Sequence, residues 1–171
     1  IQVRNPGFTK ADYEAVFKKY LGVTNVIWLA DGVQGDDTHG HVDDLSRFIN
    51  EDTIVTIVET NPESANYDPL QENLKRLQVA KLENGKSPVI VALPMPKQID
   101  FEDLTLPASY ANFLILNKCV LVPTFNDVND RKALNILAEC FPDREVIGIS
   151  AIDLIWGLGT LHCLSQQIPA E

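Results

Sequence analysis

The sequence carries one cysteine in a setting suited to covalent chemistry. Residues 157–163 have the sequence GLGTLHC, so two glycines and a histidine precede Cys163. Glycines let the backbone approach a ligand closely, which makes Gly159 a candidate for the pocket wall, and a neighbouring imidazole favours the thiolate. A cysteine in an apolar chain is more often buried and inert, and we prefer this interpretation for Cys119 and Cys140. With its glycine-rich and polar flanks, Cys163 is the candidate nucleophile.

Residues 35–44, GDDTHGHVDD, place an imidazole two residues from a carboxylate. On an extended strand, His41 and Asp43 would share one face, because side chains alternate with a period of two. An imidazole titrates near neutral pH, so His41 can donate a proton to a leaving amine and later accept one from water. Two alternatives are a surface residue and a zinc ligand, although zinc would need ligands beyond His39 and His41.

The same stretch contains four aspartates, Asp36, Asp37, Asp43 and Asp44, which are too many for a core. An acidic loop is commonly a solvated surface or a calcium site, but the EF-hand pattern is not met. A carboxylate can accept two parallel N–H bonds from a planar guanidinium. We therefore favour a pocket for a cationic guanidino group.

The composition excludes several classes of function. The chain has 171 residues, 45% of them hydrophobic, and a formal net charge of -10. It can bury a sizeable core, whereas nucleic acids and anionic membranes both demand a basic surface. The three cysteines show no CxxC spacing, which indicates a reducing, cytoplasmic setting. The sequence has no signal-peptide pattern and no apolar run of membrane-spanning length.

Hydrophobic periodicity and turn residues predict alternating strands and helices. We expect a helix that begins after Thr9 and ends at Gly22, and a second helix of about 16 residues that buries Leu70, Leu74 and Leu77. A third helix is expected over 127–141, and a loop over 94–107. The predicted strands are 1–3, 26–29, 45–49, 53–59, 89–93, 112–116, 119–122 and 146–149.

A ββαβ pattern occurs twice in this order of elements, with Asn50 and Asn117 at equivalent turns 67 residues apart. If the units repeat around an axis, His41/Asp43, Asn112 and Cys163 each lie where a unit begins and would meet at one end of the assembly. Similar patterns also arise by chance in α/β proteins. Because the chain opens directly into the end of a strand, we expect it to be a segment of a longer protein.

Segments 35–48 (GDDTHGHVDDLSRF), 109–113 (SYANF) and 157–167 (GLGTLHCLSQQ) resemble the agmatine deiminase and Porphyromonas-type peptidylarginine deiminase family. The resemblance spans nearly the whole chain. It implies the guanidine-modifying pentein fold, an α/β propeller of five ββαβ units around a pseudo-fivefold axis. Residues 1–171 would then be the C-terminal part of a single pentein deiminase domain, an incomplete ring.

The resemblance also implies roles for individual residues. It makes Cys163 the nucleophile, His41 the general acid/base and Asp43 a carboxylate that binds the guanidinium. Asp37 and Asn112 lie in matching motifs and are expected to bind substrate. No metal and no organic cofactor is implied.

Two departures from the family concern the pocket. The run 157–160, GLGT, has fewer glycines than in relatives and lacks an asparagine found there. The family also has substrate-binding acids in its N-terminal half, upstream of Ile1. We therefore expect this segment alone to be inactive, unless the missing N-terminal half is supplied as a separate chain.

The reaction we favour is hydrolysis of agmatine to N-carbamoylputrescine and ammonia, a step of putrescine biosynthesis, through a covalent cysteine thiouronium intermediate. Deimination of arginine to citrulline in peptides is the nearest alternative; an amidinotransferase and a non-catalytic scaffold of the same fold are less favoured. The expected partners are a cationic guanidino small molecule or an arginine-containing peptide, and the missing half of the protein. Neither nucleic acid nor membrane is expected. The sequence leaves the choice of substrate and assembly into a homo-oligomer open.

Overall fold

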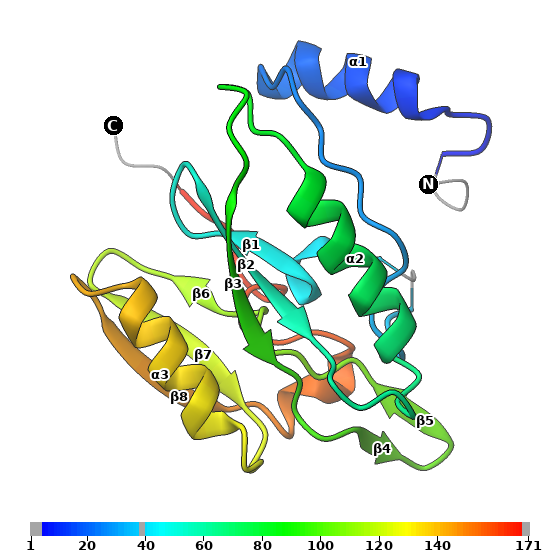
Figure 1. The fold of residues 1–171 in the computed structure, drawn as a ribbon. Coiled ribbons are helices and arrows are strands. Elements are labelled where there is room, and N and C mark those ends of the chain that lie inside the picture. Colours follow the sequence, from blue (N-terminus) through cyan, green and yellow to red (C-terminus); the bar gives the residue numbers. More distant parts are fainter. Residues whose placement is uncertain (1–4, 38–39, 169–171) are drawn as a thin grey trace.

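A computed structural model describes residues 5–37 and 40–168 (Figure 1). The strand expected over 1–3 and the side chain of His39 lie outside these ranges. None of the helices in the described ranges has the length and hydrophobicity needed to cross a membrane. In chain order the elements are α1 (Lys10–Leu21), η1 (Val42–Asp44), β1 (Ser46–Phe48), β2 (Thr53–Val58), α2 (Tyr67–Val79), β3 (Val89–Pro94), β4 (Ile99–Phe101), β5 (Leu104–Leu106), β6 (Leu114–Ile115), β7 (Cys119–Thr124), α3 (Asp130–Cys140), β8 (Glu145–Ser150) and η2 (Leu154–Gly157).

The predicted ββαβ repeat is confirmed. In the first unit, β1 pairs antiparallel with β2, and α2 carries the chain to β3, which pairs parallel with β2. The second unit repeats this arrangement with β6, β7, α3 and β8. The strands of the described residues form three separate open sheets, the third being the β4–β5 pair. The structure therefore shows two complete units, in a mixed α/β fold.

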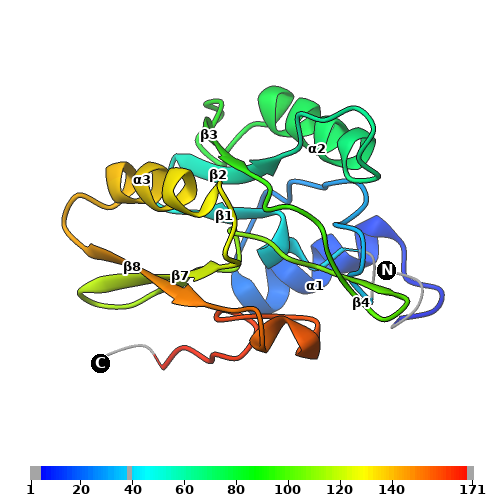
Figure 2. The same cartoon turned by 90° about the horizontal axis from the view of Figure 1, so that it is seen from below.

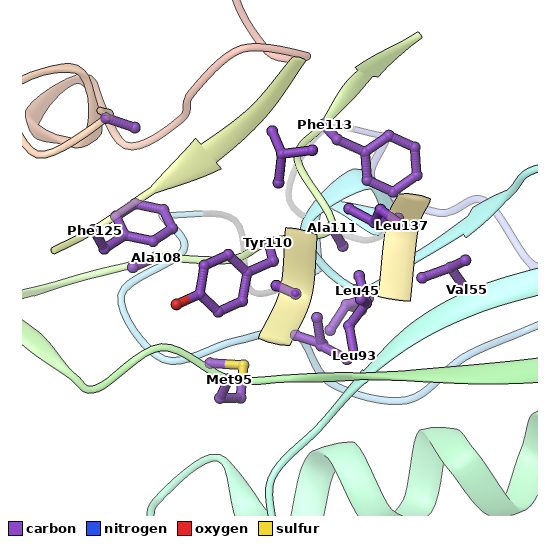
Figure 3. Close-up of a cluster of buried hydrophobic side chains, with 14 of the residues drawn as sticks. Leu45, Val55, Leu93, Met95, Ala108, Tyr110, Ala111, Phe113, Phe125 and Leu137 are labelled. Carbon is purple, nitrogen blue, oxygen red and sulfur yellow. The ribbon is translucent and has the colours of Figure 1, made fainter. Parts of the chain in front are cut away.

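The core lies between the two units. The segment 107–113 runs from one unit to the other, and its residues Tyr110, Ala111 and Phe113 are fully buried. Figure 3 shows these side chains close to Leu93 of β3 and Leu137 of α3. Helices α2 and α3 lie on the same side of the molecule, and the C-terminal segment lies on the opposite side (Figure 2). The position of the segment 107–113 matters for the site, because it places Asn112 in the interior.

Helix α1 forms as predicted but does not bury its apolar face. Thr9 caps it with a capping box, and Gly22 ends it in a left-handed conformation. No residue of the helix is buried, and Tyr20 and Leu21 are largely exposed. In Figure 1 the helix stands apart from the two sheet units. Its apolar face is therefore covered only in part, with Tyr13 and Phe17 half-buried and the Tyr13 ring 6.3 Å from that of Trp28.

The prediction of a strand over 26–29 is wrong. This segment is extended but pairs with no strand of the described residues. Its continuation is instead held by Asn73 of α2, whose Oδ1 accepts a hydrogen bond from the Ala30 amide at 2.6 Å and whose Nδ2 donates to the Asp31 carbonyl at 2.9 Å. A buried side-chain amide thus replaces the ladder that the apolar run suggested.

The loop predicted over 94–107 contains a hairpin, which is a second correction. β4 pairs antiparallel with β5, and Glu102 lies in the turn with a φ of 50°. The three prolines and several acids of this stretch obscured two short alternating runs, 99–101 and 104–106. Helix α2 is also shorter than the expected 16 or so residues: it has 13 and ends at Val79.

The hairpin fixes the loop that carries the aspartates. Gly35 has a φ of +89°, and a Cβ at this position would lie 2.2 Å from the Thr105 carbonyl oxygen of β5. Since real Cβ atoms do not approach backbone this closely, Gly35 allows the two segments to pack. The acidic loop is thereby held against the β4–β5 hairpin.

Substitution of Gly35 by Ala should therefore destabilise the protein more than the left-handed backbone alone explains. Gly85→Ala is the matched control, because Gly85 also has a positive φ, +77°, but nothing lies within 4 Å of its Cβ position. We expect Gly35→Ala to lower the free energy of unfolding by about 1–3 kcal/mol more than the control, the usual cost of overpacking. Urea denaturation measures both. Equal losses would contradict the contact with Thr105.

Candidate active site

The first part of the site is the 3₁₀ helix η1, which immediately precedes β1. The expectation that His41 and Asp43 lie on an extended strand is wrong: His41 is the N-cap of η1, and Asp43 lies within it. The chain turns here because the carboxylate of Asp36 accepts hydrogen bonds from the amides of Gly40, at 2.8 Å, and His41, at 2.7 Å. Asp43 and Asp44, neighbours in η1, differ in burial. The side chain of Asp43 is 18% exposed, whereas the whole Asp44 residue is 1% exposed.

The second part is Asn112, whose buried side chain joins the C-terminal loop to η1. Its Oδ1 accepts hydrogen bonds from Thr160 Oγ1 at 2.9 Å, from the His162 amide at 3.0 Å and from the Cys163 amide at 3.3 Å. All three partners are donors here, so the oxygen must face the loop. The Nδ2 group then faces the acids and the sulfur. Thr160, whose hydroxyl donates to Asn112, belongs to the run 157–160 that lacks the asparagine found in relatives.

Asp43 lies where these two parts meet. Its Oδ2 is 2.7 Å from His162 Nδ1, 3.2 Å from Asn112 Nδ2 and 3.2 Å from Cys163 Sγ. Burial by itself would raise the pKa of Asp43, but the hydrogen bonds with His162 and Cys163 outweigh it and lower that pKa. The Asp43 carboxylate therefore stays ionised beside the sulfur at neutral pH.

Cys163 is held as a thiol by its acidic surroundings. Partial burial of the sulfur, followed by the hydrogen bond and charge of Asp43 and the charge of Asp44, raises the pKa of Cys163 to about 11. The 3.0 Å hydrogen bond from Asn112 Nδ2 opposes this rise. A thiol with this pKa is a weak nucleophile near pH 7, and a cation beside the carboxylates would activate it.

Gly159 lies directly against the cysteine. A Cβ at this position would be 2.7 Å from the Cys163 Cβ and 2.9 Å from its Sγ, whereas nothing lies within 4 Å of the equivalent position at Gly157. A side chain at Gly159 would therefore displace the sulfur from its partners. Glycine at position 159 thus leaves room for the Cys163 side chain, and its predicted contact with substrate stays a prediction.

His41 and Asp37 belong to a neighbouring cluster built on Asp36. His41 Nδ1 is 2.9 Å from Asp36 Oδ1 and 3.9 Å from Asp37 Oδ1. Asp36 is buried, while Asp37 is exposed. The imidazole that pairs with Asp43 is instead that of His162. The two clusters are joined through η1, which follows His41 directly.

Asp44, counted from the sequence among the acids of a guanidinium pocket, is instead buried, and Arg47 was missed as part of the site. Asp44 accepts a hydrogen bond from Asn112 Nδ2 at 2.8 Å, and burial, then the charges of Asp43 and Asp36, raise its pKa to about 7. Arg47 of β1 is partly buried; its Nη1 donates to the carbonyl of Phe113 at 2.8 Å. Burial lowers the pKa of Arg47, while the nearby acids favour its charged form.

A groove of about 1080 Å³ opens beside these residues. Its lining includes Asp43, Arg47 and His162, together with Phe17 and Leu21 of α1. The lining also includes Glu51, Glu83 and many apolar side chains, but neither Cys163 nor Asn112.

Two groups of side chains have the spacing of a metal site in the described residues: Asp36/Asp37/His41 and Asp43/Asp44/Cys163. In the first, Asp36 already accepts two backbone amides and lies beside an imidazole nitrogen. In the second, the Nδ2 group of Asn112 donates to all three members. An N–H donor directed at all three acceptors explains the second group without a cation, and neither group supports a metal assignment.

The structure therefore brings together four of the six candidates from the sequence: Cys163, Asp43, Asn112 and Gly159. His41 and Asp37 lie in the adjoining cluster. The sequence pointed to His162 only as a neighbour of the cysteine, and nothing in its pattern indicated a bond with Asp43 across 119 residues. The burial of Asp44 and the inward direction of Arg47 likewise had no local signal.

Comparison with known proteins shows the family of the chain. A family model described as Porphyromonas-type peptidyl-arginine deiminase matches residues 1–169. The chain belongs to this family. A relative from Latilactobacillus sakei subsp. sakei (strain 23K), named "Putative agmatine deiminase", is 37% identical over 98% of this chain and 51% of its own length.

Solved structures of the family are also similar. The "Putative Arginine Deiminase" of Porphyromonas gingivalis matches with a TM-score of 0.92 and 39% identity, over 96% of this chain and 49% of that protein. The agmatine deiminase of Enterococcus faecalis matches with a TM-score of 0.92 and 32% identity, over 96% of this chain and 50% of that protein. The chain thus spans about half the length of the relatives it matches.

The contact between Asp43 and Cys163 predicts a change in thiol chemistry. Asp43→Asn removes a negative charge beside the sulfur, so the pKa of Cys163 should fall below its starting value of about 11. Cys163 should then react faster with iodoacetamide at about pH 9; peptide mass spectrometry separates it from Cys119 and Cys140. Asp37→Asn, which removes a charge not in contact with the sulfur, should leave the rate nearly unchanged. An equal rate in Asp43→Asn and the unaltered protein would contradict this assignment.

Proposed function

We propose that the protein carries out hydrolytic deimination of a guanidino substrate, with agmatine as the first candidate. The observation that carries the proposal is the convergence of a thiol and a carboxylate: Cys163 Sγ lies 3.2 Å from Asp43 Oδ2 and 3.0 Å from Asn112 Nδ2. A carboxylate can hold the guanidinium while the sulfur faces its carbon. The relationship to proteins named as agmatine deiminases supports the choice of substrate class.

In the proposed reaction, the Cys163 thiolate attacks the guanidinium carbon and forms a C–S bond. The C–N bond to one terminal nitrogen then breaks, and His41 protonates the departing ammonia. Water, deprotonated by the same imidazole, attacks the thiouronium carbon and releases the ureido product and the thiol. Agmatine and water would thus give N-carbamoylputrescine and ammonia. No metal and no organic cofactor takes part in this scheme.

The charge of the substrate would activate the nucleophile. The carboxylates of Asp43 and Asp44 raise the pKa of the thiol in the absence of ligand. A guanidinium bound to Asp43 offsets this negative field, so the thiolate becomes easier to form when substrate is present. The sulfur would then be reactive chiefly toward bound cations.

The domain is proposed to be the C-terminal part of a single pentein deiminase domain that another half completes. The chain spans about half of its relatives, and it contains two of the ββαβ units expected in a five-unit ring. The apolar face of α1 and the groove beside β1 are surfaces that the other half could cover. On this proposal the segment alone is inactive, because further substrate-binding acids lie in the other half.

Peptidylarginine is the second candidate substrate. It is favoured by the description of the matching family as a peptidyl-arginine deiminase. Both substrates present the same guanidinium to Asp43 and differ only in the tail. Comparing ureido-product formation from agmatine and from a short peptide with C-terminal arginine separates the two substrates.

The cytoplasmic location expected from the sequence remains a prediction.

Loss of the nucleophile should abolish turnover of the full-length protein. Cys163→Ala is expected to lower the rate of ureido-product formation from agmatine by several orders of magnitude, because covalent catalysis is no longer available. Cys140→Ala is the control, since Cys140 lies on α3 and is not part of the site. Intact mass should show an adduct in the unaltered protein and in the control, but not in Cys163→Ala. Unchanged turnover in Cys163→Ala would refute the proposed enzyme.

The two imidazoles can be distinguished by comparing His41→Ala with His162→Ala. General acid/base catalysis typically contributes about 10²–10⁴ in rate, so His41→Ala should lose at least about 10²-fold in kcat and one limb of the pH–rate profile. His162→Ala should lose less, because His162 orients Asp43 in the proposed scheme. A larger loss and a lost pH limb in His162→Ala would transfer the acid/base role to His162.

A further inference from the structure

Three acceptors converge on the single amide nitrogen of Asn112. Asp44 Oδ1 is the nearest at 2.8 Å, followed by Cys163 Sγ at 3.0 Å and Asp43 Oδ2 at 3.2 Å. An amide group has only two hydrogens. One is therefore directed to Asp44, and the other is shared between the sulfur and Asp43.

We propose that Asp44 is a positioning residue, which anchors one hydrogen of the Asn112 amide so that the other is directed at the Cys163 sulfur. The residue that touches the reacting atom is Asn112, and Asp44 acts through it. This inference takes from the proposed function only the identity of the nucleophile. It assigns Asp44 a role in orienting Asn112, in addition to its negative charge.

Asp44 is built into the fold as an anchor should be. Its residue exposure is 1%, its carbonyl accepts a hydrogen bond from Ser109 Oγ at 2.7 Å, and its amide donates to the His41 carbonyl at 3.2 Å. Its other carboxyl oxygen, Oδ2, has no hydrogen-bond partner among the described residues. Leaving a buried oxygen unpaired is costly. The fold bears this cost, and the other oxygen, Oδ1, accepts the hydrogen bond from Asn112. This arrangement supports a role of Asp44 in holding that amide.

The charge of Asp44 acts on the sulfur in the opposite direction to the hydrogen bond it secures. A negative Asp44 raises the pKa of the Cys163 thiol, whereas the Asn112 hydrogen bond lowers it. Burial, together with the charges of Asp43 and Asp36, raises the pKa of Asp44 to about 7, whereas the hydrogen bond from Asn112 and the charge of Arg47 oppose the rise. As the pH rises through this value, the carboxyl group becomes charged. The thiol should then become harder to ionise, so the logarithm of its alkylation rate should rise less steeply with pH around pH 7 than a single thiol ionisation would give.

A pair of substitutions separates the two effects. Asp44→Asn removes the charge but keeps an oxygen that can accept the Asn112 hydrogen, whereas Asp44→Leu has a similar shape and neither property. Asp44→Ala is a second variant without an acceptor, for use if leucine prevents folding. Circular dichroism and the urea midpoint select the variants that fold. Thiol reactivity is then measured as the iodoacetamide alkylation rate of Cys163 between about pH 6 and 11, followed by peptide mass spectrometry.

We expect Cys163 to have a lower pKa in Asp44→Asn than in the unaltered protein. The pH dependence of its alkylation rate should then show no effect of the Asp44 ionisation near pH 7. The variants without an acceptor should be alkylated about tenfold or more slowly than Asp44→Asn at the same pH, the effect of losing one hydrogen bond to a charged group. Equal rates in Asp44→Asn and Asp44→Leu would overturn the positioning role.

The Asn112→Ala background provides the decisive control. If Asp44 acts through the amide, exchanging Asn for Leu at position 44 should change the alkylation rate only when Asn112 is present. A difference of the same size without Asn112 would show a general structural effect and refute the proposal. Because alkylation requires no turnover, this outcome does not depend on whether agmatine is the substrate. Failure of the deiminase assay with a positive result here would leave the role of Asp44 in place.

Discussion

The site depends on the fixed orientation of one buried side-chain amide. An amide accepts at one end and donates at the other, so Asn112 can bind the donors of the C-terminal loop through Oδ1 and the acceptors of η1 through Nδ2. A carboxylate could not donate, and a hydrocarbon could do neither. Because the group is buried, each of its bonds is costly to lose. This single residue therefore holds Cys163 and Asp43 in register, although they lie far apart in the chain.

The packing of the core makes that junction possible. The segment that carries Asn112 passes between the two ββαβ units, where Tyr110 and Phe113 are fully buried. Tyr110 also donates to Asp130 at the start of α3, at 2.7 Å, which ties the segment to the second unit. Arg47 of the first unit binds the carbonyl of Phe113. Large apolar side chains fix the position of the backbone, and a few buried polar bonds fix its rotation.

Electrostatics at the site favours a cationic ligand. Asp43 stays ionised, Asp44 is poised near neutrality, and the thiol between them is difficult to ionise. Arg47 lies close enough to favour the charged acids, but its own pKa is lowered by burial. Negative charge brought into a partly buried place is unfavourable unless it is paired. A guanidinium would relieve this repulsion and would also favour the thiolate, which links recognition to reactivity in the proposed function.

The sequence by itself determined the repeat of two ββαβ units, the capped ends of α1, and the candidate roles of Cys163 and Asp43, because periodicity, capping and residue chemistry are local properties. Local signals were insufficient for the segment 26–29 and for the β4–β5 hairpin, since pairing depends on which backbone lies alongside. Only the tertiary structure decided that His162 is bound to Asp43, and that Asp44 is buried on the Asn112 amide. Those relationships join residues 119 and 68 positions apart, and packing of the two units determines which of them meet.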